Sequence, residues 1–389
     1  MNRYETYKDS GISWLGEVPD HWEVKRLKFL ARIQNGADYK HVETNDGYPV
    51  IGSGGQFAYA NSYLYDGESV LLGRKGTIDK PLYVNGKFWT VDTMYYTEIL
   101  KNTYPKYLYY LTLTIDFGRY STQTALPSMT QTALNNLVFA VPHYKEQTAI
   151  AHYLDAKLGE IDALIGKQQT LLEKLAEQRT AVITHAVTKG LNPAAPMKNS
   201  GVEWLGDVPA HWDKIAIHYL VNLKSGDSIT ALDLVENGEY PVFGGGGFRG
   251  YINSFTHCGK FNLIGRQGAL CGNVTLANGK FFATEHAIVV TPIKKLDTKW
   301  LYYLLITMNL NQYSTSAAQP GISAEVIGRL RVPFPNFKEQ ATIADYLDQE
   351  TAKIDRLCDT VNQTIGRLKE YRTALITQAV TGKIKVTDE

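Results

Sequence analysis

Cysteine is scarce in this chain, with three residues (Cys258, Cys271 and Cys358) among 389. So few cysteines cannot build a disulfide framework, which excludes the small stapled secreted folds and indicates a reducing compartment. Long apolar runs are also missing, because YLYYLTLTIDF and WLYYLLITM fall short of the roughly 18 residues that a membrane-spanning helix needs. The polar opening MNRYETYKDSG does not fit a signal peptide. We therefore expect a cytoplasmic protein without a membrane partner.

Motifs for catalysis and metal binding are absent or poorly formed. No Pro-Pro dipeptide occurs, which excludes the Asn/Asp-Pro-Pro-aromatic motif of amino-methyltransferases. GGGFRG at 245–250 matches G-x-G-x-x-G, but no helical pattern follows it, so a dinucleotide site is not expected. His257, Cys258 and Cys271 lack the four-ligand spacing of a zinc site. We expect no catalytic residue, metal or cofactor in this chain.

Net charge gives little direction, since 40 basic residues oppose 39 acidic ones. Lys and Arg exceed Asp and Glu by one in residues 1–145 (15 − 14) and by three in residues 196–338 (13 − 10). That excess is compatible with a nucleic-acid surface on two domains, and equally with ordinary solvated charge.

The chain consists of two copies of one sequence unit. GISWLGEVPDHW at 11–22 returns as GVEWLGDVPAHW at 201–212, YPVIGSGG at 48 as YPVFGGGG at 240, and LLGRKGT at 71 as LIGRQGA at 263. PHYKEQTAIAHYLD at 142–155 matches PNFKEQATIADYLD at 335–348. A period of about 190 residues is too long for a solenoid, whose repeats run roughly 20 to 50 residues. We infer that a complete domain with an appended helix has been duplicated.

The amino-acid composition changes once within each copy. Its first part is rich in glycine, tyrosine and short β-branched runs, which predicts short strands, together with single helices at PKYLYYLTLT and TKWLYYLLIT and caps at Thr130 and Ser323. From about residue 146 and again from 339, glycine becomes rare and helix formers take over. The expected division is therefore a globular domain at 1–145, a helical region at 146–190, a linker at 191–200, a second globular domain at 201–338 and a second helical region at 339–389.

Heptad spacing predicts that the two helical regions pack on each other. One position is occupied by Ile161, Gln168, Leu175 and Val182, and in the second copy by Ile354, Val361, Leu368 and Leu375. Leu164, Leu171, Leu357 and Tyr371 fall three residues later and are expected on the companion position. Two helices joined through a globular domain would most simply lie antiparallel, so the fold class is α+β, with two pseudo-symmetric globular domains and two long helices in an antiparallel coiled coil.

Loops between strands offer the best candidates for binding. GRKG (73–76) and GRQG (265–268) each follow an apolar strand, and glycine lets a loop tip approach a groove closely. Arginine can bind guanine or phosphate and glutamine can bind adenine; an exposed hairpin turn is the alternative. The glycine loops IGSGGQF and FGGGGFRG raise the same two possibilities. The candidate DNA-binding residues are Arg74, Lys75, Thr77, Ser53, Gln56, Lys40, Arg266, Gln267, Arg249 and Asn273.

The repeated tryptophan phrase is too apolar to be catalytic. Pro19 and Pro209 fix its turn, and its aromatic side chains are expected to pack on the long helices as a clasp. With the Glu-Gln pair that opens each helical region, the phrase supplies the candidate docking residues: Trp14, Trp22, Trp204, Trp212, Glu146, Gln147, Glu339 and Gln340.

These motifs together resemble the specificity subunit of type I restriction-modification enzymes. The resemblance rests on P-x-x-x-EQ-x-x-I-x-x-YLD, on R-T-A-[VL]-I-T-x-A-V-T and on WLG-x-VP-x-HW, each present twice. It implies two target-recognition domains that read a split, asymmetric double-stranded DNA sequence, and helices that dock two DNA methyltransferase subunits and, with them, restriction subunits. S-adenosylmethionine, ATP and Mg would belong to those partners. The alternatives are a self-sufficient enzyme acting on DNA, and a stand-alone tandem scaffold that binds DNA or carbohydrate.

Overall fold

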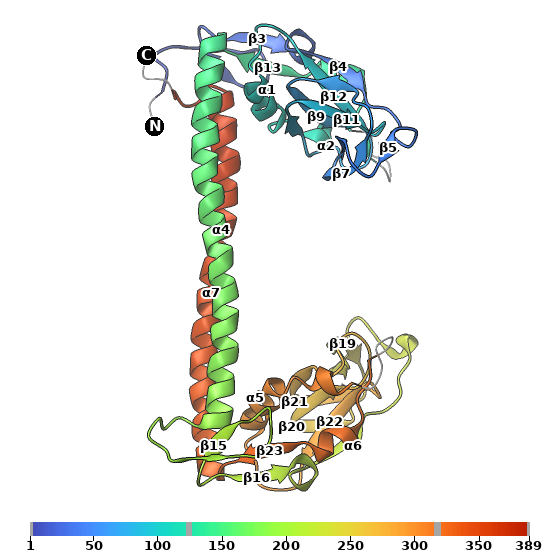
Figure 1. Ribbon diagram of the computed structural model, residues 1–389, viewed down its shortest axis with the longest axis vertical. Coiled ribbons are helices and arrows are strands. Elements are labelled where there is room, and N and C mark those ends of the chain that lie inside the picture. The colour runs from blue at the N-terminus through green and yellow to red at the C-terminus, as the bar shows by residue number, and fades with distance from the viewer. Residues whose placement is uncertain (1–2, 122–126, 315–319, 387–389) are drawn as a thin grey trace. The chain divides into compact units, whose positions relative to one another are not determined.

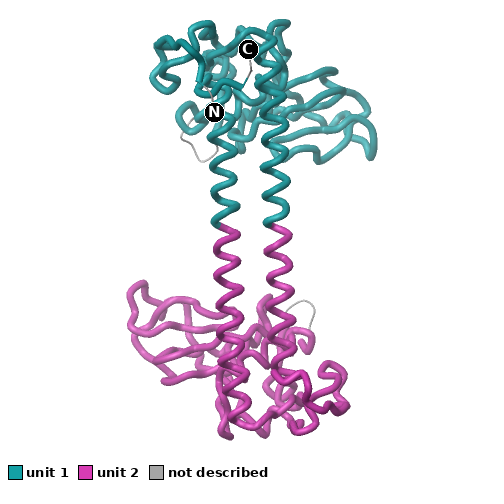
Figure 2. The backbone as a smooth tube through the Cα atoms, turned by 90° about the vertical axis from the view of Figure 1, so that its left-hand side faces the viewer, with its two compact units in different colours: residues 1–168, 363–389 teal, residues 169–362 magenta. Residues whose placement is uncertain are grey.

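A computed structural model describes residues 3–121, 127–314 and 320–386. The chain forms two compact units, and their limits differ from those of the two sequence copies. Unit 1 combines residues 1–168 with residues 363–389, and unit 2 consists of residues 169–362 (Figure 2). Each unit therefore contains one globular part, the first half of the helix that follows it and the second half of the other copy's helix.

Two long helices, α4 (Tyr144–Lys189) and α7 (Phe337–Val380), pass from one unit to the other (Figures 1 and 2). Within unit 1, Arg372 Nε of α7 lies 3.1 Å from Asp162 Oδ1 of α4, and within unit 2 Arg179 of α4 pairs with Asp355 of α7. The helices therefore run antiparallel within each unit, as the heptad pattern predicts. Glycines with positive φ, Gly190 and Gly382, follow their ends.

The predicted seam is half right. Ile161, Leu175, Ile354, Val361 and Leu375 are buried, as expected. Their companions lie four residues later rather than three, at Ile165, Leu172 and Ile365, which are buried or half-buried. The expected companions are exposed instead: Leu164 by 42%, Leu171 by 41%, Leu357 by 52% and Tyr371 by 47%. Apolar residues stand side by side at 164–165 and 171–172, and the partner helix covers one of each pair.

The globular part of unit 1 holds two main sheets, ordered β10-β9-β12-β4 and β5-β7-β6-β11-β8. β9 is buried at all five residues, as a central strand should be. Two pairs, β1-β2 and β13-β3, complete the unit. Its strands are β1 (Tyr7–Asp9), β2 (Glu17–Pro19), β3 (Glu23–Arg26), β4 (Ala31–Asn35), β5 (Glu43–Thr44), β6 (Tyr48–Gly52), β7 (Gly55–Ala60), β8 (Tyr65–Asp66), β9 (Ser69–Gly73), β10 (Leu82–Val84), β11 (Lys87–Thr90), β12 (Met94–Ile99) and β13 (Val138–Val141).

Unit 2 joins the equivalent strands into one sheet, ordered β17-β22-β20-β21-β18-β19, because β20 and β21 are long enough to belong to both halves. Pairs β16-β23 and β14-β15 correspond to β3-β13 and β1-β2. Its strands are β14 (Met197–Asn199), β15 (Asp207–Pro209), β16 (Asp213–Ala216), β17 (Val221–Ser225), β18 (Tyr240–Gly244), β19 (Gly247–Ile252), β20 (His257–Gly265), β21 (Val274–Ala283), β22 (Ala287–Pro292) and β23 (Arg331–Phe334).

Short helices occupy matching places in the two units. The predicted single helices are α1 (Pro105–Thr112) and α5 (Thr298–Thr307). Thr130 and Ser323 cap the next ones, accepting hydrogen bonds from Ala133 N and Val326 N, as the sequence predicts. The remaining helices are α2 (Phe117–Tyr120), α3 (Gln131–Asn135) and α6 (Ala324–Arg329), with 3-10 turns at Leu27–Phe29, Ile217–Tyr219, Ala231–Asp233 and Leu310–Tyr313. An α+β fold with paired long helices is confirmed.

Candidate nucleic-acid interface

The GRKG loop of unit 1 follows the buried strand β9 and is held by main-chain hydrogen bonds on two sides. Arg74 N donates to Thr93 O at 2.8 Å, while Arg74 O accepts from Met129 N at 3.0 Å. Gly76 N donates to Pro127 O at 2.9 Å. With its backbone groups paired within the fold, the loop presents its side chains from a fixed frame.

The predicted binding residues of unit 1 gather mainly at one edge. Lys75 and Thr77 are exposed, and Arg74 lies over the Tyr95 ring with Nη1 3.3 Å from Asp92 O. β6 runs parallel to β11, so the glycine turn after β6, with Ser53 and the exposed Gln56, leaves the sheet at the edge where residues 91–93 follow β11. Lys40 differs, because its ammonium group already pairs with Glu43 at 3.0 Å.

The GRQG loop of unit 2 has the same frame. Arg266 N donates to His286 O at 2.8 Å, Arg266 O accepts from Ile322 N at 2.9 Å, and Gly268 N donates to Pro320 O at 2.9 Å. The side chains of Arg266, Gln267, Arg249 and Asn273 are all exposed. Arg266 Nη1 reaches Ser225 Oγ at 3.4 Å, beside a cavity of about 360 Å³.

The glycine loop of unit 2 packs directly against this frame. A Cβ at Gly265 would collide with the carbonyl oxygen of Gly245, and a Cβ at Gly245 would lie 3.2 Å from Gln267 O and 3.0 Å from His286 O. Glycine at these two positions therefore brings three segments together, a packing that the loop motifs alone do not predict. Two polar pairs that follow the end of a strand after one intervening residue, Asp92-Thr93 after β11 and Glu285-His286 after β21, are the signal that sequence reasoning missed.

The tryptophan phrase forms a clasp on the long helices, as predicted. Trp22 has no exposed surface, donates its Nε1 to Glu146 Oε1 at 3.2 Å at the start of α4, and contacts Gly382 beyond the end of α7. Trp212 is equally buried in unit 2 and contacts Gly190 beyond the end of α4. Lys383 Nζ donates to Leu15 O at 3.1 Å in unit 1, and Lys189 Nζ to Leu205 O at 3.3 Å in unit 2.

Several predicted docking residues are thus committed inside the chain. Gln147 is buried, accepts from Tyr104 N at 2.8 Å and donates to Asn102 O and Pro142 O. Gln340 is buried too, and it accepts from Asp297 N at 3.0 Å and donates to Pro335 O. Glu146 and Glu339 pair with His21 and His211 at 2.9 and 3.1 Å. Among the tryptophans, Trp14 is 40% exposed and Trp204 is half-buried, which leaves these two with surface for a partner.

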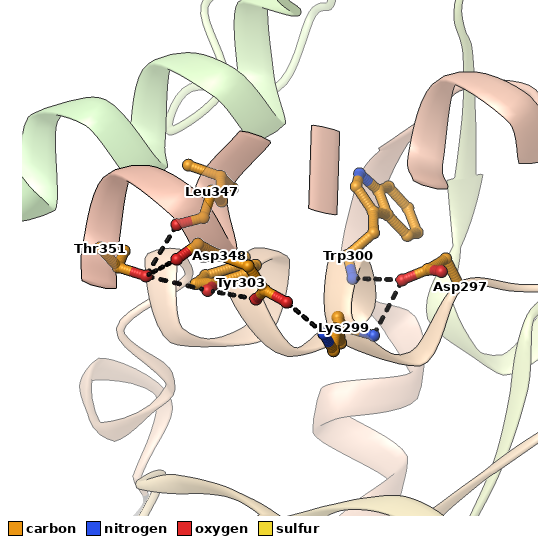
Figure 3. Close-up of polar contacts among 7 residues, drawn as sticks. All are labelled: Asp297, Lys299, Trp300, Tyr303, Leu347, Asp348 and Thr351. Atoms are coloured by element: carbon orange, nitrogen blue, oxygen red, sulfur yellow. Dashed lines mark hydrogen bonds and ion pairs between the residues drawn. The ribbon is translucent and has the colours of Figure 1, made fainter. Parts of the chain in front are cut away.

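The YLD end of the helix motif ties each globular part to its helix. In unit 2, Asp348 of α7 accepts from Tyr303 Oη of α5 at 2.8 Å and pairs with Lys299, while Thr351 lies 3.2 Å from the same hydroxyl (Figure 3). Burial, with the hydrogen bond to Asp348, raises the pKa of Tyr303 to about 12, so the phenol stays neutral. Asp155 holds Tyr110 and Lys106 in the same way in unit 1.

Neither a membrane helix nor a metal cluster is found in the described ranges. No helix there is both long and apolar enough to cross a bilayer. Within the same ranges, no group of three or more His, Cys, Asp or Glu residues is placed to hold a metal ion.

Known proteins match both copies. The family model described as "Type I restriction modification DNA specificity domain" matches residues 19–174 and 209–367. The EcoprrI specificity subunit of Escherichia coli is 40% identical over 154 residues, which cover 39% of this chain and 37% of that subunit. The EcoDI specificity subunit of Escherichia coli is 24% identical over 424 aligned positions, covering 95% of this chain and 90% of that one.

Solved structures share the fold at low identity. A chain from a structural study of complex assembly and conformational transition in the type I R-M system aligns with a TM-score of 0.75 at 15% identity, covering 94% of this chain and 99% of that one. The HsdS subunit from Thermoanaerobacter tengcongensis aligns with a TM-score of 0.54 at 15% identity, covering 94% and 98%. Because the family model matches most of the sequence in two domains, this chain belongs to the type I restriction-modification specificity subunits, which are non-catalytic recognition subunits.

Proposed function

We propose that this chain reads an asymmetric, bipartite double-stranded DNA target, with one half-site for each unit. The observation that carries the proposal is one loop frame used twice with different side chains: Arg74 and Lys75 in unit 1, Arg266 and Gln267 in unit 2. A fixed frame with altered side chains is what two related but non-identical half-sites require. A homodimer would impose a palindrome, whereas a diverged duplication does not.

We further propose that the chain scaffolds two DNA methyltransferase subunits and, with them, restriction subunits. The clasp and the YLD contacts recur in both units, so the same local framework occurs twice, which supports two equivalent places for a partner to bind. S-adenosylmethionine, ATP and Mg would be bound by those partners. The chain alone would transfer no methyl group and would cut no DNA.

The experiment assembles the full chain with its methyltransferase partner and scores methylation of a randomised DNA library. We expect two short preferred sequences separated by an unread spacer, and no methylation by the chain alone. A single contiguous or palindromic preference would contradict the bipartite proposal. In the same assay Arg74→Ala separates two roles: relaxed preference at one position indicates base reading, while a uniform loss with a smaller salt slope indicates phosphate contact.

Exposed apolar side chains on the helices are the proposed docking flank. In unit 1 the flank consists of Leu164 and Tyr371, and in unit 2 of Leu171 and Leu357, all more than 40% exposed. Other positions of the same helices carry the ion pairs Asp162–Arg372 and Arg179–Asp355. Uncovered leucine on one side of a coiled coil favours burial against a further helix.

Replacing Leu164 and Tyr371 by glutamate should weaken methyltransferase binding at unit 1 at least tenfold, because two charges would enter an apolar contact. The thermal midpoint of the free chain should hardly change, because both side chains are exposed. Binding is measured by titration with the purified methyltransferase. Glu160→Ala and Lys369→Ala, exposed and polar on the same helices, are the matched control. Equal affinity for both pairs of variants would exclude this flank.

A further inference from the structure

The segment after β11 in unit 1, and after β21 in unit 2, has the same place beside the loop frame. Thr93 O accepts from Arg74 N and His286 O accepts from Arg266 N, both at 2.8 Å. Thr93 and His286 are therefore equivalent residues in the two copies. Their carbonyl oxygens accept the same hydrogen bond from the loop arginine, but their side chains differ in chemistry. No contact in the clasp or in a sheet explains that difference.

His286 has the features of a side chain held for recognition. It is 41% exposed, and its Nε2 lies 3.3 Å from the carboxylate of Glu285, whose other oxygen is buried with no hydrogen-bond partner in the described residues. An imidazole ring carries two nitrogens that can donate or accept hydrogen bonds, so it can contact the polar edge of a base.

The glycine loop packs closely against the segments that carry Gln267 and His286. A Cβ at Gly245 would lie 3.0 Å from His286 O and 3.2 Å from Gln267 O, so glycine there keeps side-chain bulk out of the space between the two segments. Gln267 is exposed at the tip of a loop whose neighbouring backbone groups are already paired. The buried Gly245 thus holds together the two segments that carry Gln267 and His286.

We propose that Gln267 and His286 form one base-reading pair and that Lys75 and Thr93 form its counterpart, each determining specificity at the corresponding position of its own half-site. This rests on the proposed reading of DNA by the two units. Glutamine donates to and accepts from adenine, whereas lysine donates to the acceptors of guanine. Histidine and threonine extend the difference, since the threonine methyl group favours the methyl group of thymine. The two half-sites therefore differ at this position.

The test exchanges the pair within the full chain, assembled with its methyltransferase partner. Gln267→Lys with His286→Thr should lower methylation of the original target about tenfold to a hundredfold through one or two adjacent positions of one half-site. The other half-site should be unchanged. The reciprocal variant, Lys75→Gln with Thr93→His, should alter the other half-site and leave the first intact. Asn278→Ala is the control and should change neither, because Asn278 is an exposed residue within β21, paired with Lys260 of β20.

Unchanged preferences in both exchanges would overturn the pairing, and so would a uniform loss on all sequences. Thermal unfolding of each variant checks the fold; if a double variant unfolds, His286→Thr alone supplies the same readout. Failure of the proposed function is distinguishable, because the unaltered assembly would then show no half-site preference. If the assembly keeps a normal bipartite preference that these substitutions do not change, the inference is wrong while the proposed function stands.

Discussion

Inserting seven residues after Leu172 and seven after Ile365 should lengthen the unread spacer of the target by about three base pairs. Both helices cross from one unit to the other, and seven helical residues add about 10 Å, close to three base-pair steps of about 3.4 Å. A full heptad keeps the buried positions of both helices in phase. The loops are untouched, so the half-sites themselves should not change.

The measurement is methylation of a library with fixed half-sites and spacers of varied length, by the extended chain assembled with its methyltransferase. Insertion into α4 alone is the control, because it shifts α4 against α7. The ion pairs Asp162–Arg372 and Arg179–Asp355 could then not form at the same time. That variant should assemble poorly. An active, doubly extended chain that retained the original spacer would show that the helices do not set the spacing.

Trp22→Ala should destabilise unit 1 by about 3–5 kcal/mol, the usual cost of removing a large buried aromatic side chain. Trp22 is fully buried, donates to Glu146 and contacts Gly382, so the substitution opens a cavity where both ends of the chain meet. Trp14→Ala is the matched control from the same phrase. Its side chain is 40% exposed, and we expect a cost of about 1 kcal/mol or less.

Thermal and denaturant unfolding of the full chain give the comparison. Limited proteolysis locates the defect, because the segment after Val380 should become cleavable in the Trp22→Ala chain before unit 2 is attacked. Trp22→Phe should fall between the two variants, since it keeps an aromatic ring and loses the hydrogen bond to Glu146. Equal stability of Trp22→Ala and Trp14→Ala would contradict the clasp.

Repetition made much of this molecule predictable from its sequence. The strand-rich parts, α1, α5, the two caps and the antiparallel long helices all follow from residue patterns that occur twice. The companion position of the seam does not follow, because apolar neighbours at 164–165 and 171–172 satisfy either spacing and the partner helix decides. A pattern reports which residues are apolar, and packing selects among adjacent ones.

The candidate site was predicted less completely. The GRKG and GRQG loops stand out because glycine brackets a polar pair, but His286 has no such mark in the sequence. It is placed beside Arg266 by a main-chain hydrogen bond between segments 20 residues apart. For the docking residues, a distinctive motif does not indicate an exposed surface. The motif residues Trp22, Trp212, Gln147 and Gln340 are buried contacts within the chain.

The composition of unit 1 also sets an order of events during synthesis. Unit 2 is one continuous stretch, residues 169–362, whereas unit 1 needs residues 363–389. When the ribosome has completed unit 2, Trp22 still lacks Gly382, and Tyr107 still lacks the Val380 carbonyl to which its hydroxyl donates. The emerging chain therefore carries an incomplete unit 1 with exposed apolar surface until residues 363–389 have been made, a period in which chaperones would engage it. Messages truncated after residue 362 would yield a complete unit 2 attached to an unfinished unit 1.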